Sequence, residues 1–161
     1  MTAPAFAHAA EIERSLELLA ERCEDPAPLV YGKVFAAHPQ MEAHFWRDTN
    51  GSIRGEMLAR TFTALLDFVG DRHYADHMIG TELITHEGYD VPREVFATFF
   101  GFVAETVREV LGADWTAATE TAWRELLAEI DGYVGRTPRS DVTAPAFTEM
   151  RQAFESRGGA A

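Results

Sequence analysis

The sequence predicts an all-α protein built as one domain, and three observations support that prediction. Apolar residues recur three or four positions apart through most of the chain, which is the spacing of one face of an α-helix. Almost no stretch alternates apolar and polar residues, as a half-buried strand would. The chain has 161 residues, of which 47% are hydrophobic and 25% are charged. This length and composition are typical of a single packed core.

Two helices and a short helical turn are expected in the first part of the chain. The first helix ends at the proline-rich turn 25–28, and the second spans 29–37. Pro39 then starts a short helical turn that runs toward Phe45. The apolar stripes of the two helices are formed by Ile12, Leu16 and Leu19 and by Val30, Val34 and Phe35.

A long third helix is opened by Gly51 and Ser52 and closed by Gly70. A less regular stretch follows, and then a helix of about ten residues that ends at His86, shortly before Gly88. The apolar stripe of the third helix is formed by Leu58, Phe62, Leu65, Leu66 and Val69.

Two further long helices complete the pattern. Pro92 occupies the first position of one helix, which continues to Gly112. The last helix is expected to start near a cap at Asp114 and to end at Gly135.

The composition turns polar after these helices. We therefore expect a folded domain over residues 1–135 and a polar C-terminal extension over residues 136–161. Within the extension, residues 145–156 are compatible with one short, weakly amphipathic helix.

The charge of the chain argues against two classes of partner. Its 14 basic and 26 acidic residues give a formal charge of −12, which repels nucleic-acid phosphates and anionic lipid surfaces. Cys23 is the only cysteine, so a disulfide within the chain is excluded. No apolar run has the length of a membrane span, and the first ten residues lack the basic start of a signal peptide. These features predict a cytoplasmic protein.

Six histidines are the natural candidates for chemistry. His73 and His77 are four residues apart, but no neighbouring glutamate or third ligand supports a zinc site. His86 differs because it ends a short helix and is followed by a turn and an aromatic-rich helix. An imidazole held in that way beside an apolar cavity suits an axial iron ligand. The alternative is a helix-end histidine that interacts favourably with the helix dipole.

Three motifs give the chain its resemblance to a known family. They are the segment from Tyr31 through Pro39 to Phe45, the segment from His86 to Pro92, and the pair of long C-terminal helices that carries Trp123. In this order and spacing, they resemble bacterial single-domain globins and the globin domain of flavohaemoglobins. The resemblance covers about residues 10–134. It implies the globin fold, in which helices A, B, C, E, F, G and H surround a haem pocket.

The resemblance implies a haem b cofactor whose iron is bound by Nε2 of His86. The other ring N–H of His86 would donate to a backbone carbonyl near Glu82 and fix the tautomer. The residues that would touch the porphyrin are Phe45, Leu58, Val91, Phe96 and Phe99. Each of them would also serve as ordinary core packing.

On the opposite, distal side, Tyr31 would donate a hydrogen bond to bound O2. Two registers remain open for the helix that lines this side. One places Arg54 at the distal ligand position with Leu58 one turn later, and the other uses Ile53 and Met57. In the first register, Arg54 could turn toward an anionic ligand or toward a haem propionate.

Two positions depart from the flavohaemoglobin pattern. Phe96 stands where that family has a tyrosine beside the proximal histidine, and the position of a partner glutamate falls near Pro138, beyond the last helix. Both departures imply a less anionic imidazole and argue against peroxidase-like chemistry. Glu82 stands where the family has an apolar residue, and its side chain either faces solvent or partly replaces the missing partner.

The function implied by the resemblance is reversible binding of O2 and other diatomic gases such as NO and CO. Nitric oxide dioxygenation is an additional expectation, and it would require an external reductase because the sequence contains no flavin or nicotinamide domain. Two alternatives remain. One is a gas or redox sensor that acts through a protein partner, and the other is a globin-fold interaction module without haem.

Overall fold

The computed structural model describes residues 6–138, and these residues form helices connected by short loops. No strand occurs within this described range. The α-helices are α1 (Ala9–Arg22), α2 (Ala27–Ala37), α3 (Ser52–Val69), α4 (Ala75–Gly88), α5 (Arg93–Leu111) and α6 (Ala117–Arg136). Two 3₁₀ helices, η1 (Pro39–Phe45) and η2 (Gly112–Asp114), lie between them. The all-α prediction is confirmed.

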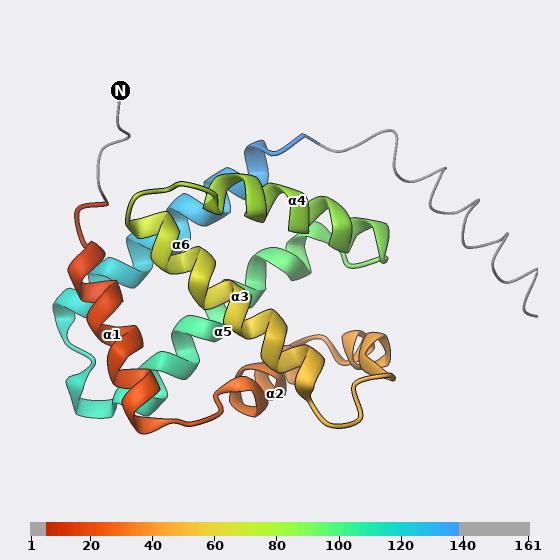
Figure 1. Ribbon diagram of the computed structural model, residues 1–161, viewed down its shortest axis with the longest axis horizontal. Helices are drawn as coiled ribbons and strands as arrows, with labels where there is room; N and C mark the ends of the chain where they lie inside the picture. Colours follow the sequence, from red (N-terminus) through yellow and green to blue (C-terminus); the bar gives the residue numbers. More distant parts are fainter. Residues whose placement is uncertain (1–5, 139–161) are drawn as a thin grey trace, which may run out of the picture.

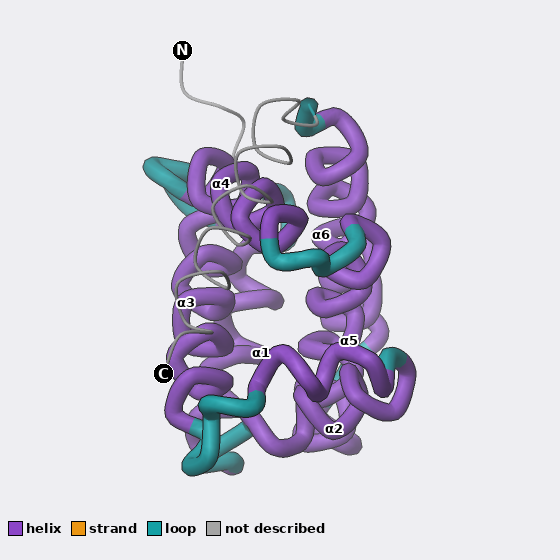
Figure 2. Tube along the Cα trace, turned by 90° about the vertical axis from the view of Figure 1, so that its right-hand side faces the viewer, coloured by secondary structure: helices purple, strands orange, loops and turns teal. Residues whose placement is uncertain are grey.

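The helices cross one another in two layers. In Figure 1, α3 passes in front of α5, and α4 lies above both. The edge view of Figure 2 shows α3 on one side of the molecule and α5 and α6 on the other. The apolar stripes of α1, α2, α3, α5 and α6 meet in a single core, in which Trp123 is one of the largest enclosed side chains. The indole N–H of Trp123 donates to Ser15 Oγ across 3.0 Å, so its polar atom is also satisfied.

Several helix boundaries differ from the sequence predictions by a few residues. Helix α2 starts at Ala27, because Asp25 accepts a hydrogen bond from the Ala27 N–H (3.1 Å) and proline is tolerated in a first turn. Helix α4 is longer than predicted, with 14 residues. Pro92 is the N-cap of α5, so it precedes the first helical position rather than occupying it.

Two predictions about side chains were wrong. The N-cap of α6 is Thr116, whose hydroxyl accepts from the Thr119 N–H (3.1 Å), and not Asp114. The carboxylate of Asp114 instead pairs with Arg22 of α1, and Asp114 is itself the last residue of η2. Leu66 is 42% exposed and does not belong to the core stripe, because it lies at the edge of α3 beside a groove against α1.

The connection between α3 and α4 determines where α4 begins. The carboxylate of Asp67 accepts hydrogen bonds from the backbone N–H groups of His73 (3.1 Å), Tyr74 (3.0 Å) and Ala75 (2.8 Å). Burial opposes ionisation of this carboxyl, but the three N–H donors and the nearby His73 hold the pKa of Asp67 below its usual value. Helix α4 is therefore anchored at its first turn to the end of α3.

The structure bears on two further expectations only in part. None of the helices in residues 6–138 is long and apolar enough to cross a membrane. The 145–156 segment, for which the sequence is compatible with a helix, lies outside the described residues, as does almost all of the predicted extension.

Candidate functional site

Tyr31 of α2 lies at the centre of an aromatic cluster. Its ring is 5.9 Å from that of Phe35, 5.4 Å from that of Phe45 and 5.6 Å from that of Phe99, measured between centroids. These partners come from α2, from the end of η1 and from α5. Tyr31 is 3% exposed, so the cluster closes around it. The structure thus brings together three of the predicted site residues, Tyr31, Phe45 and Phe99.

The hydroxyl of Tyr31 is buried and has no hydrogen-bond partner among the described residues. Burial raises its pKa well above the usual value; the charge of Arg54 lowers the pKa somewhat, and that of Asp48 raises it. The phenol therefore stays protonated at neutral pH and keeps an O–H donor. Because buried polar groups are nearly always paired, an unpaired hydroxyl in this position requires an explanation.

His86 lies in the last turn of α4 and has one ring nitrogen fixed by the helix. Its Nδ1 donates to the carbonyl oxygen of Glu82 across 2.7 Å, in agreement with the bond that the resemblance implied. The Nε2 atom has no hydrogen-bond partner among the described residues. Because Nδ1 carries the proton in this arrangement, Nε2 has a free lone pair. The carbonyl oxygen of His86 in turn accepts from the Val91 N–H (3.0 Å), which fixes the turn after the helix.

The carboxylate of Glu82 also lies beside the imidazole. Its Oε2 is 3.7 Å from His86 Nδ1, which is too far for a hydrogen bond but close enough for a charge interaction. Within the described residues, no arginine or lysine pairs with Glu82. The nearby Arg93 is bound to Glu87 (2.6 Å), and Arg60 is bound to Glu56 (3.0 Å).

Helix α5 connects the two candidate groups through its aromatic residues. Phe96 packs against the His86 ring with centroids 5.2 Å apart, as Phe99 does against Tyr31. Phe100 contacts both phenylalanines, at 5.8 Å from Phe96 and 6.3 Å from Phe99. A continuous run of rings therefore extends from the imidazole to the phenol along one helix.

The start of α3 carries the residues of the two distal registers. Leu58 is 2% exposed and belongs to the same core cluster as Tyr31. Arg54, one turn earlier, is partly buried, whereas Ile53 is 45% exposed. Met57 is half-buried. The guanidinium of Arg54 is bound by Asp48, with Nε 2.8 Å from the carboxylate.

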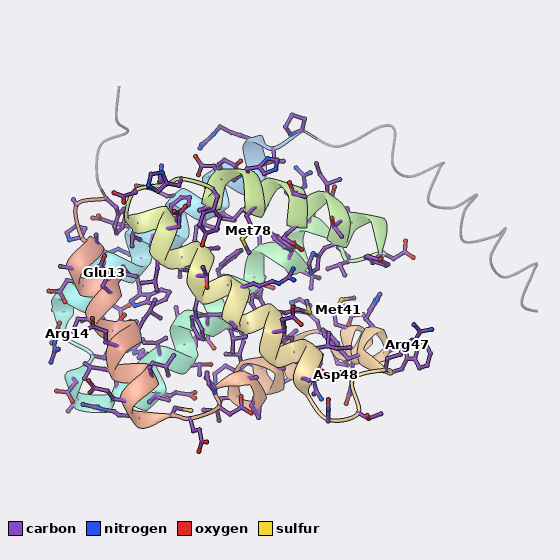
Figure 3. All side chains as sticks on the ribbon, viewed as in Figure 1. Glu13, Arg14, Met41, Arg47, Asp48 and Met78 are labelled. Carbon is purple, nitrogen blue, oxygen red and sulfur yellow. The ribbon has the colours of Figure 1, made fainter. Side chains whose placement is uncertain are left out.

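Asp48 contacts Arg54 from outside the candidate site, and the sequence analysis did not single it out. It lies in the turn between η1 and α3 (Figure 3), and its carboxylate accepts from the backbone N–H groups of Ile53 and Arg54, each 3.0 Å away. The available signal was an acidic residue a few positions before a helix start, which is typical of a capping residue. Its side-chain bond to Arg54 depends on the loop conformation and has no such signal.

The remaining histidines are not brought to the site. The His73 side chain is 77% exposed and lies 3.5 Å from Asp71, and His38 shares a 3.2 Å hydrogen bond with Thr98. No group of three or more His, Cys, Asp or Glu side chains within the described ranges could hold a metal ion among them. A metal bound through one protein atom and a cofactor would not require such a group.

The residues around His86 and Tyr31 fit an iron porphyrin. Nε2 of an oriented, neutral imidazole is the ligand atom that haem iron takes from a histidine. The phenylalanines provide apolar faces of the kind that a porphyrin contacts, and the buried Tyr31 hydroxyl provides a donor that has no acceptor among the described residues.

The family model named Globin matches residues 29–133, which is well over half of the chain. The chain therefore belongs to the globin family. The helical fold around a histidine and a buried aromatic cluster agrees with this membership. Proteins of this family generally bind haem and, with it, diatomic gases such as O2. Comparisons with curated proteins and with solved structures gave no match.

Proposed function

We propose that the protein binds haem b through His86 Nε2 and reversibly binds O2, NO and CO on the side of Tyr31. When bound, the haem would supply an iron centre to which a diatomic gas can bind. The residues proposed to hold the porphyrin by apolar contact are Phe45, Leu58, Val91, Phe96 and Phe99.

One observation carries this proposal. The buried Tyr31 hydroxyl has no hydrogen-bond partner among the described residues, and its ring lies at one end of the run of aromatic rings that leads to His86. Ordinary core packing pairs such a hydroxyl or replaces it with an apolar group, because an unpaired buried hydroxyl costs about 1–3 kcal/mol. A haem with a bound gas would use the Tyr31 hydroxyl as a donor and Nε2 of the partly exposed His86 as an iron ligand, and so accounts for both residues.

The chain's own residues then have distinct tasks. Tyr31 donates its hydroxyl proton in a hydrogen bond to the bound gas, and the low dielectric of the aromatic cluster strengthens that bond. The Glu82 carbonyl holds the imidazole in one tautomer. We further propose that the Glu82 carboxylate, 3.7 Å from Nδ1, makes the imidazole more electron-rich and partly replaces the partner that Phe96 cannot supply.

The distal register that begins with Arg54 is the one we propose. The charge of Arg54 lowers the pKa of the Tyr31 phenol, and Leu58, one turn after Arg54, is buried in the same core cluster as Tyr31. In the rival register, Ile53 would have to turn inward from a position where it is 45% exposed. Tyr31, Arg54 and Leu58 therefore form the proposed distal side.

Nitric oxide dioxygenation is a finer proposal for the same site. The reaction consumes one NO, one O2 and one electron for each nitrate ion, so sustained turnover requires an external reductase. The measurement is NO consumption by the reduced, oxygenated protein with and without cell extract. Turnover that continues only with extract supports dioxygenation, and a single stoichiometric burst under both conditions supports gas storage.

The experiment that tests the main proposal is an absorption spectrum of the purified protein, incubated with hemin, in its ferric, reduced and CO-bound forms. A stoichiometric Soret band that shifts on reduction and again with CO is the expected result. Its absence would overturn the proposal and leave the haem-free interaction module. Complex formation with a protein partner that depends on the haem state would instead favour the sensor.

A further inference from the structure

Asp48 is the only residue with a charged side chain among the buried residues of the described range. Its carboxylate accepts three hydrogen bonds, from the backbone N–H groups of Ile53 and Arg54 (3.0 Å each) and from Arg54 Nε (2.8 Å). A fourth bond joins Arg54 Nη2 to the Asp48 backbone oxygen (3.2 Å). The guanidinium is thus held by two of its nitrogens.

Two of these bonds are sufficient for a helix cap, and two are not needed for it. The bonds to backbone N–H groups satisfy donors in the first turn of α3, which is what a capping carboxylate does. The bonds that Nε and Nη2 of Arg54 donate to Asp48 satisfy no backbone N–H group of the helix. They instead fix the position of the long, charged Arg54 side chain.

The position of the guanidinium matters because Arg54 is one of the residues of the proposed distal side. It precedes the enclosed Leu58 by one turn, and its charge acts on the Tyr31 phenol. A guanidinium free to move there would be a strong donor to any anion bound beside Tyr31. Held by Asp48, its charge is already neutralised.

We propose that Asp48 is a positioning residue that withholds the Arg54 guanidinium from the distal pocket and so makes the protein discriminate against anionic ligands in favour of neutral gases. The inference rests on the proposed function for its anion part. Releasing Arg54 would leave the buried Asp48 carboxylate without its cation, and this cost disfavours the release. Substituting Asp48 by a neutral residue removes the cost.

The test compares azide affinity of the ferric haem-bound protein for the wild type, Asp48→Asn, Arg54→Met and the double variant. Asparagine keeps a side-chain oxygen that can accept the Ile53 N–H, so the start of α3 retains a cap. We expect Asp48→Asn to bind azide about tenfold more tightly, the gain of one charge-assisted hydrogen bond. Arg54→Met and the double variant should bind azide equally.

A neutral ligand provides the matched control. The association rate constant of CO with the reduced protein should be the same in Asp48→Asn as in the wild type within about twofold, because CO is uncharged and is not attracted by the Arg54 guanidinium. Unchanged azide affinity in Asp48→Asn overturns the proposal. An equal gain in the double variant also overturns it, because the effect would then not depend on Arg54.

A second measurement requires neither haem nor a variant. Hydrogen exchange of the arginine Nε–H groups is followed by ¹⁵N NMR, with Arg14 as an internal reference, because Arg14 lies exposed on α1 (Figure 3). We expect the Arg54 Nε–H to exchange at least about tenfold more slowly than that of Arg14. Equal exchange rates would overturn the Asp48–Arg54 contact whether or not haem binds. Absence of a Soret band in the wild type would overturn the proposed function and, with it, the proposed discrimination against anionic ligands. The exchange rates would then test only the Asp48–Arg54 contact.

Discussion

Replacing Tyr31 by phenylalanine should affect stability and ligand retention in opposite directions. The Tyr31 hydroxyl is buried without a partner, so in the haem-free chain its removal takes away a desolvation cost and leaves the ring contacts with Phe45 and Phe99 intact. We expect the free energy of unfolding of the haem-free chain to rise by about 1 kcal/mol, toward the low end of the cost of an unpaired hydroxyl. The measurement is urea unfolding followed by circular dichroism.

Tyr133 offers a matched control in the same fold. Its side chain is partly buried, and its hydroxyl donates to the backbone oxygen of Asp76. Tyr133→Phe removes a hydrogen bond that is made and leaves a carbonyl without its donor, so this variant should lose about 1 kcal/mol of stability. Both substitutions delete a tyrosine hydroxyl. Opposite signs of the change in unfolding free energy would therefore reflect whether that hydroxyl is hydrogen-bonded.

The ligand-binding form should respond in the other direction. In the haem-bound protein, Tyr31→Phe removes the proposed donor to bound O2, a bond of about 1.5–3 kcal/mol, and dissociation should accelerate about ten- to a hundredfold in stopped flow. If Tyr31→Phe destabilised the haem-free chain as much as Tyr133→Phe does, the hydroxyl would be paired and the reasoning refuted. An unchanged dissociation rate would transfer the donor role to Arg54 or to water.

Three further predictions concern the helix that carries His86. His86→Ala should abolish stable haem binding, measured as loss of the Soret band at one equivalent of hemin, and a normal ferrous-CO spectrum in that variant would contradict the axial assignment. Glu82→Gln should raise the ferric/ferrous midpoint potential by on the order of 30–60 mV, because the negative charge beside the imidazole favours ferric iron and about 59 mV corresponds to a tenfold change in a one-electron equilibrium constant. Spectroelectrochemistry measures the potential. An unchanged potential would place the carboxylate in solvent. Asp67→Asn should cost about 1 kcal/mol at neutral pH, the usual cost of a lost cap. Because folding lowers the pKa of Asp67, its ionised carboxylate stabilises the fold above the unfolded pKa of 3.8, and this stabilisation is lost as the pH falls through the lower folded pKa. The free energies of unfolding of the wild type and of Asp67→Asn should therefore converge in acid.

The helices could be predicted from the sequence because their signals are local. A stripe such as Ile12, Leu16 and Leu19 records which face is buried, and the structure buries it. The ends were less certain because tertiary contacts compete for the same side chains. Asp114 is an acceptable cap by local rules, but it pairs with Arg22, which lies far away in the sequence, and Thr116 takes its place.

The candidate site depended on contacts that spacing does not record. Nothing local indicates that Tyr31 meets Phe99, 68 positions later, and the expectation came from the likeness to a family. The interactions specific to this chain were harder still to foresee. The Asp48 contact with Arg54 requires a particular turn conformation, in which Gly51 adopts a left-handed φ of 78° at the start of α3. The sequence shows that a glycine is present at this turn. It does not show which side chains the turn brings close to each other.

The pairing of buried polar groups separates Tyr31 from the rest of the core. Ser15 and Thr106 each donate to a carbonyl within their own helix, and Asp48 accepts three bonds. Among the described residues, the buried side-chain atoms left without a partner are Tyr31 Oη and Asp76 Oδ1. Asp76 lies in the first turn of α4, where the helix N-terminus favours a carboxylate without a specific bond. Tyr31 has no such compensation, since the rings around it offer no acceptor for its hydroxyl. A phenylalanine would fill the same space without the cost, so the hydroxyl is best explained by an acceptor that residues 6–138 do not contain.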